Sequence, residues 1–290
     1  MKIRLLDVLI LGLAAAGVAY LARRVVVGLD YRWQWEVIPQ YLLRYDPQAG
    51  HLVPNLLLQG LFTTIRLSLW ATLLATLLGT LMGLARLSGR LFRRMVGRSY
   101  VECVRNLPPL VLVFLFYFFL SQQVLPWLGL DQWLRGASPE MRWWVGALLA
   151  PPGSLGAFVS ALATLAVYEG AYIAEIVRAG VQSVERGQWE AARALGLTPR
   201  QQLRHVIMPQ AVQRILPPLA GQFISTIKDS AIVSVISIPE LTFQGMELMS
   251  ATYLTFEVWI TITAMYLLLT LGCSLSLSRL ESHLRRRWRN

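Results

Sequence analysis

The chain has 290 residues, of which 55% are hydrophobic and 15% are charged, and its mean hydropathy is +0.50. This balance argues against a soluble globular domain and is typical of a membrane protein. The net charge of +11 would suit a nucleic-acid-binding protein, but the arginines gather in alternate loops and in the tail. We therefore expect an all-α integral membrane protein without a nucleic-acid partner.

Long uncharged segments give the candidate membrane spans, because a helix needs about 20 apolar residues to cross the hydrocarbon. A sixth candidate, Leu5 to Ala22, follows a basic start and has a cleaved signal peptide as its alternative. A fifth, 211 to 238, is interrupted by Lys228 and Asp229. The sequence thus predicts about six transmembrane helices, of which the four uncharged ones cover residues 67 to 85, 107 to 130, 143 to 168 and 258 to 278.

The arginines predict the orientation, because cytoplasmic loops carry an excess of basic residues. They gather between 86 and 105, between 178 and 214, and in the tail, whereas 239 to 257 holds no basic residue. These arginine-rich loops and the C-terminus are therefore expected in the cytoplasm. The segment 23 to 54, expected outside, also carries arginines, so the orientation of the first helix stays open.

The outer stretch 131 to 155 has two interpretations. A short interfacial helix around Arg142 to Ala150 would place Trp143 and Trp144 at the headgroup level, where tryptophan is enriched. An ordinary loop is the alternative, because the periodicity is weak.

A polar stretch, QWEAARALGLTPRQQLRHVIMPQ, separates two apolar segments at residues 188 to 210. Its first part reads as a two-turn helix between Gly187 and Gly196, and its second as a helix that begins at the N-cap Thr198 and closes at Pro209. A helix this short is marginal in water unless it packs on something. It is either a preformed knob for a partner protein or a hairpin that links two spans.

Catalytic machinery is not expected in this chain. A P-loop needs a lysine followed by Ser or Thr, and the two lysines, Lys2 and Lys228, precede Ile and Asp. The three histidines lie far apart, and no His, Cys and carboxylate cluster has metal-ligand spacing. We therefore expect no catalytic residue, no metal site and no bound cofactor, and energy must come from a partner.

Charged residues inside the predicted spans are expected to be functional or paired, because each costs about 2.5 to 3.5 kcal/mol on insertion scales. We expect Glu169, near the end of its uncharged run, to pair with Lys228, which leaves Asp229 toward a pathway or a second subunit. These side chains, with Gln222 and Thr226, would alternatively contact a zwitterionic solute. They could also serve only to pack helices together.

One pattern resembles the cytoplasmic signature of the membrane subunits of bacterial ABC importers. It comprises Glu190, Ala191, Ala192 and Gly196, followed after nine residues by Val206, Ile207, Met208 and Pro209, with Val and Met replacing the usual Ile and Leu. The segments GLFTTIRLSL, YVECVRNLPPLVLVFLFYFF, AYIAEIVRAG and LPPLAGQFISTIKDSAI are similar to the branch for polar amino acids of the histidine, glutamate, glutamine and arginine type. This resemblance covers residues 54 to 280.

The resemblance implies a five-helix permease core in a bacterial inner membrane, preceded by an N-terminal helix and outer segment at 1 to 53 and followed by a basic tail at 281 to 290. It implies that the coupling loop 178 to 210 docks into a separate ATPase subunit, which binds ATP and Mg, through Glu190, Ala191, Ala192 and Gly196, with Pro209 closing the pattern. The other implied partners are a second permease subunit, identical or related, and an external solute-binding protein. The alternatives are an ion-coupled carrier or channel and a membrane scaffold that binds partners or anionic lipid.

Overall fold

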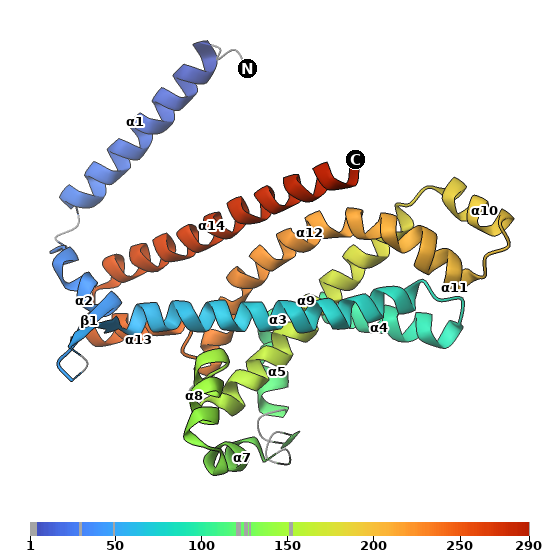
Figure 1. Cartoon of the computed structure of the whole chain (residues 1–290). Helices are drawn as coiled ribbons and strands as arrows, with labels where there is room; N and C mark the ends of the chain where they lie inside the picture. Colours follow the sequence, from blue (N-terminus) through green and yellow to red (C-terminus); the bar gives the residue numbers. More distant parts are fainter. Residues whose placement is uncertain are drawn as a thin grey trace. The chain divides into compact units, whose positions relative to one another are not determined.

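The computed structural model describes residues 5–28, 31–48, 50–119, 123–124, 127, 129–150 and 153–289 (Figure 1). These form two compact units, which divide after Ile38. The first unit holds helix α1 (Leu5–Gly28) and the 3-10 turn η1 (Trp35–Val37). A helix is thus confirmed in the first predicted segment, and its apolar part covers Val8–Gly17.

A short helix begins at the boundary between the units, and the second unit continues with a hairpin that the all-helical expectation missed. Helix α2 (Ile38–Leu42) leads into strands β1 (Leu43–Asp46) and β2 (His51–Pro54), which pair antiparallel. The turn between them is closed locally, because Asp46 accepts hydrogen bonds from the backbone N–H groups of Gln48 and Gly50. Short pairings of this kind leave little trace in hydropathy.

Four helices of the described residues are long and apolar enough to cross a membrane, and a bent pair would be a fifth span if its two helices cross together. This number is roughly consistent with the expected total of about six, although α1, whose apolar part covers only Val8–Gly17, is not among the spans. The four are α3 (Leu56–Arg86), α9 (Leu155–Gln182), the continuous helical stretch Pro199–Ile236 that contains α12 (Met208–Asp229) and the 3-10 segment η4 (Ser230–Ile236), and the span Thr255–Arg279 of α14 (Thr255–Arg289).

The predicted span 107 to 130 is helical in its first part, and its residues 120–122, 125–126 and 128 lie outside the described residues. Helix α4 (Leu91–Asn106) meets α5 (Pro109–Phe119) at an angle of 111° (Figure 1). The bend falls at Leu107, whose backbone is extended because a residue before proline is pushed out of the helical region. The eleven described residues of α5 cover about 16 Å, roughly half of the hydrocarbon thickness.

The predicted span 143 to 168 is wrong in its bounds. The structure places a separate helix, α8 (Pro139–Leu148), before α9, and a further short helix, α7 (Leu130–Gly136), before that. Helix α8 confirms a helix rather than a loop in this stretch, and its place at the membrane interface stays a prediction. It is tied to α3, because Arg66 donates to the Gly146 carbonyl at 2.8 Å and Trp70 to the Leu148 carbonyl at 2.9 Å.

The central packing is between α3 and α9, and it depends on small residues. A Cβ atom on Gly79 would lie 2.7 Å from both the Gly170 carbonyl oxygen and Ile173, and one on Gly83 would lie 2.7 Å from the Ala174 carbonyl oxygen. The two helix backbones can therefore approach only because these positions carry no side chain. Small-residue contacts of this kind are how membrane helices gain packing energy when burial in lipid supplies none.

Two apolar clusters hold the remaining elements in place. One lies around Leu67, Phe158 and Val233, where α3, α9 and η4 meet. The other joins α9 to α12 through Val181, Ala211 and Ile215. Helix α12 carries Pro217 and Pro218 in its interior, and the short helix α13 (Leu241–Thr252) separates η4 from α14.

Candidate functional site

The polar interlude forms the short helix α10 (Arg186–Ala194), in agreement with the predicted two-turn helix. One face of α10 packs against its own chain, because Ala192 is buried and Trp189 joins the apolar cluster of Val184 and Ile207. Gln210 of α12 also donates to the side chain of Gln188 at 3.2 Å. This packing explains how so short a helix is stable without a partner.

The opposite face of α10 is open. Glu190, Ala191, Arg193 and Ala194 are all exposed, and Leu195 at its end is 79% exposed. The exposed leucine and the two exposed alanines form a partly apolar surface. No other part of the described chain covers this surface. The predicted docking residues Glu190 and Ala191 lie on this face, whereas Ala192 lies beneath it.

Gly196 ends α10 as predicted. Its φ of +75° is in the left-handed region, and the Gly196 N–H donates to the Arg193 carbonyl while the Leu197 N–H donates to the Ala192 carbonyl. These two bonds are the Schellman pattern, in which glycine is favoured because other side chains strain this conformation. The chain therefore leaves the helix in a sharp, fixed turn.

The second helix of the interlude begins at the predicted cap. Thr198 and Gln201 form a capping box in which each side chain bonds with the other residue's backbone N–H. Helix α11 (Pro199–Gln201) then passes into a π-helical turn, η3 (Gln202–Ile207), and on into α12 without a break. The expected stop at Pro209 is wrong, because proline in the first turn of α12 tolerates its missing N–H group.

Within the membrane-spanning core, Glu169 lies in the middle of α9 and not near its end as expected. Its side chain is fully buried, and one oxygen accepts a hydrogen bond of 2.5 Å from the Gln222 amide on α12. The other oxygen, Oε1, has no hydrogen-bond partner among the described residues, and the carboxyl interacts electrostatically with Asp229. Buried Thr226 lies on the same helix and bonds back to the Gln222 carbonyl.

The expected pair between Glu169 and Lys228 is not formed in the structure. Lys228 is exposed, and the ion pairs among the described residues do not include it. The reason is helical geometry: Gln222, Thr226 and Asp229 follow one another at helical spacing on the α9 side of α12, and Lys228 points away from its neighbour Asp229. Four of the five predicted pathway residues are therefore brought together, and Lys228 is not.

A cavity of about 620 Å³ opens between α4, α9 and α12 next to this group. Gln222 connects the two, because it lines the cavity and also donates to Glu169. Three charged side chains line the wall. The full lining is Arg105, Tyr172, Glu175, Ile176, Ala179, Gly180, Ser183, Arg214, Pro218 and Gln222.

The three charged residues of this cavity differ in whether they have a partner of opposite charge. Glu175 pairs with both Arg86 and Arg178, so its negative charge is already neutralised. Arg214 donates to the backbone carbonyl of Ser183. Arg105, which the sequence suggested only as one of many cytoplasmic arginines, has its guanidinium carbon 5.2 Å from the centre of the Tyr172 ring. Its place on the cavity wall could not be predicted from the sequence, because it depends on the bend between α4 and α5.

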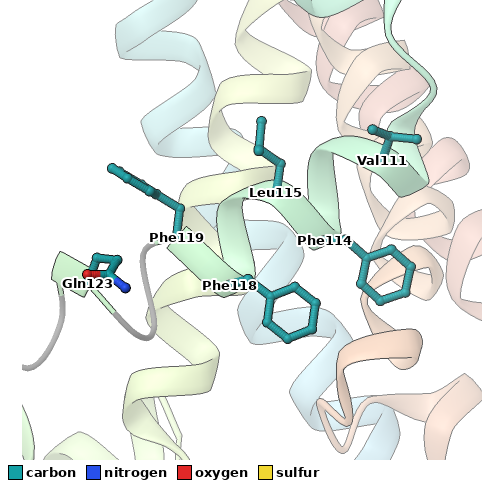
Figure 2. Close-up of a pocket in the computed structure, with 6 residues that line it drawn as sticks. All are labelled: Val111, Phe114, Leu115, Phe118, Phe119 and Gln123. Atoms are coloured by element: carbon teal, nitrogen blue, oxygen red, sulfur yellow. The ribbon is translucent and has the colours of Figure 1, made fainter.

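A second hollow, also of about 620 Å³, lies along α5 and is apolar (Figure 2). Figure 2 shows the rings of Phe114 and Phe118 on one side of the helix, and their centres are 6.1 Å apart. Its other lining residues are Val111, Leu115, Phe119 and Gln123. The described residues of its wall carry no charge, so this hollow suits lipid or an apolar protein surface better than a polar solute.

A second buried polar network surrounds Glu240 at the start of α13, in the segment 239 to 257 that holds no basic residue. The Glu240 carboxylate accepts hydrogen bonds from the backbone of Thr242 and Phe243 at the start of α13, and from the Tyr266 hydroxyl of α14 at 2.9 Å. The Thr64 hydroxyl of α3 lies 3.4 Å away. Burial raises the pKa of the Glu240 carboxyl, although these hydrogen bonds oppose the shift.

Together, four long apolar helices, a bent helix pair and a short polar helix with one open face define a multi-span membrane protein. The comparison with known families agrees: residues 75–290 match the family described as "Binding-protein-dependent transport system inner membrane component". The chain belongs to this family, the permease subunits of ABC importers. It is therefore an inner-membrane component of an ABC transporter.

Two curated relatives and one solved structure show how far the likeness extends. The probable glutamine ABC transporter permease protein GlnM of Bacillus subtilis is 36% identical over 189 residues, which are 65% of this chain and 74% of GlnM. The glutamine transport system permease protein GlnP of Escherichia coli K12 is 33% identical over 243 residues, 84% of this chain and 99% of GlnP. A crystallised amino acid ABC transporter with histidines aligns with a TM-score of 0.67 and 33% identity, covering 87% of this chain and all of that chain.

Proposed function

We propose that this permease moves a polar amino acid across the inner membrane, using ATP that is bound with Mg and hydrolysed on a separate ATPase subunit. The single observation that carries the proposal is α10, a preformed helix with one face packed on its own chain and the other left open. A helix fixed at its base can transmit force applied to its free face. The sequence supports a separate motor, because neither lysine fits a P-loop.

Three partners follow from this proposal. An ATPase subunit would dock on α10 through Glu190, Ala191 and the exposed Leu195, with Gly196 fixing the exit of the chain. A second permease subunit, identical or related, would complete the pathway and cover exposed Lys228 and the apolar face of α5. A solute-binding protein would deliver the solute from outside, and lipid would cover the remaining apolar surface.

The solute class is inferred from the relatives and from the buried polar group. Relatives with 33% and 36% identity are named as glutamine permeases, and the similar crystallised transporter is described with histidines. Glu169, Gln222, Thr226 and Asp229 gather beside the cavity at the centre of the spans, where such a solute would pass. We propose them as the polar wall of the pathway.

An experiment on α10 tests the proposal. The chain would be co-purified with its ATPase, and Ala191→Trp would place a bulky ring on the open face without touching the buried side. We expect the ATPase to be lost from the complex and uptake into proteoliposomes to fall at least about tenfold, because docking needs close approach.

Ala251→Trp, at an exposed alanine of the outer helix α13, is the matched control and should leave both measurements unchanged. The proposal would be refuted if Ala191→Trp retained the ATPase and normal uptake. Uptake by the purified chain alone, driven by an ion gradient and indifferent to ATP, would instead support the ion-coupled carrier, in which Glu169 and Asp229 would be cation sites.

A further inference from the structure

The cavity beside α9 carries an unbalanced positive charge. Its lining includes two arginines and one glutamate, Arg105, Arg214 and Glu175, which gives a net charge of +2 − 1 = +1. Glu175 is held by two further arginines outside the lining, Arg86 and Arg178. The wall therefore presents positive charge to whatever enters it, and its carboxylate is not free to cancel that charge.

Arg105 is the part of this wall that is free to bind a ligand. Arg214 already donates to the carbonyl of Ser183, whereas no carboxylate pairs with Arg105 among the residues that the structure describes. The Arg105 guanidinium lies over the Tyr172 ring, 5.2 Å from its centre, a contact that fixes its position without using its N–H groups. Five donors in a planar fork are thus left for an anion.

The elbow between α4 and α5 explains why this guanidinium is where it is. Arg105 is in the last turn of α4, directly before the 111° bend. Below it, Tyr100 of α4 donates to the Val167 carbonyl of α9 at 2.6 Å, and Val104 is buried against Ala171. Both contacts fix the last turns of α4 at the level of the centre of α9, so that Arg105 is held at the depth of Glu169.

We propose that Arg105 binds the carboxylate of the translocated solute. This inference rests on the proposed function, that the chain moves an amino acid. It names the residue that binds the negatively charged group of that amino acid. The guanidinium would hold the carboxylate by a charge-assisted, two-pronged contact. Gln222 also lines the cavity and donates to Glu169, which interacts with Asp229; the oxygens of these two carboxyl groups are acceptors that suit an ammonium group.

Binding and uptake by the complete transporter test the inference. The complex of this chain with its ATPase and second permease would be purified in detergent, and binding of labelled L-glutamine and L-glutamate measured for wild type, Arg105→Gln and Arg105→Lys. We expect Arg105→Gln to weaken binding at least about tenfold and to lower uptake in proteoliposomes to match. Arg105→Lys keeps the positive charge but loses the planar set of guanidinium donors, so its affinity should lie between those of wild type and Arg105→Gln.

The two probes separate the two sources of a carboxylate. Equal losses for glutamine and glutamate would assign Arg105 to the α-carboxylate, and a loss confined to glutamate would assign it to a side-chain carboxylate; either supports carboxylate binding. Arg94→Gln, an exposed arginine of the same helix, is the matched control and should behave as wild type.

Unchanged binding of both probes in an assembled Arg105→Gln complex would overturn the inference. A lowered melting temperature with unchanged binding would also overturn it, because it would show that Arg105 only packs on Tyr172. Loss of the ATPase from the wild-type complex would instead count against the proposed function, so the two failures are distinguishable.

Discussion

At the scale of single residues, the carboxylate of Glu240 joins three helices. It caps the start of α13 with two backbone hydrogen bonds and accepts from Tyr266 of α14 beside Thr64 of α3. Removing a helix cap costs about 1 kcal/mol, and each buried donor left unpaired adds about 1 to 3 kcal/mol. Glu240 is therefore a structural residue that holds α3, α13 and α14 together. Nothing in the neighbouring sequence indicates this role.

We expect Glu240→Ala to destabilise the protein by about 2 kcal/mol or more, because the cap and the partner of the Tyr266 hydroxyl are both lost. Thermal unfolding in detergent would measure this as a lower melting temperature. Glu247→Ala, at an exposed glutamate of the same helix, should change the melting temperature little. Equal effects of the two substitutions would contradict the role assigned to Glu240.

At the scale of helices, the contact between α3 and α9 depends on glycine. We expect Gly79→Ala to destabilise the protein by about 1 to 3 kcal/mol, because the added Cβ would overlap the Gly170 carbonyl and Ile173. Gly272→Ala on α14 is the same change with open space around it and should be neutral or gain up to about 1 kcal/mol of helix propensity. Melting temperatures of both variants, which should shift in different directions or by clearly different amounts, provide the check.

The helices that could be predicted from sequence were those whose signals are local. Glycine at the end of α10 and the Thr198 cap are fixed by neighbouring residues, and uncharged length alone indicated α3 and α14. The bounds of α8 and α9 were predicted wrongly, because the uncharged run 143 to 168 extends from one helix into the other, although Pro151 and Pro152 lie between them. The tertiary contact of Trp70 with Leu148, which fixes the end of α8, leaves no trace in hydropathy.

Partners across the membrane core were harder to predict than helices. The sequence indicated that Glu169 needed a partner but not which residue supplied it, because the rotation of α12 decides between Gln222 and Lys228. Arg105 was hidden for a similar reason: its place on the cavity wall depends on the bend that follows it. Contacts that depend on the rotation of one helix relative to another cannot be predicted from the sequence of either helix alone.

At the scale of the whole molecule, we propose that α10 lies in the cytoplasm, with the C-terminus on the same side, and that the turn between α13 and α14 lies outside. Leu195 is 79% exposed beside α10, and Tyr253 is 81% exposed in that turn. In a chain with Cys103→Ser and Cys273→Ser, a membrane-impermeant maleimide added to intact cells should label Tyr253→Cys but not Leu195→Cys. Permeabilised cells should label both, and the reverse pattern in intact cells would show the opposite topology.

The paired prolines of α12 have a mechanical consequence. Pro217 and Pro218 have no N–H groups, so the carbonyls of Gln213 and Arg214 receive no bond from the following turn of the helix. A helix flexes most easily where no bond has to be broken, and Pro218 borders the cavity. We therefore expect α12 to bend at Pro217 and Pro218 when the proposed ATPase moves α10, so that the cavity wall would shift while the two halves of the helix keep their shape.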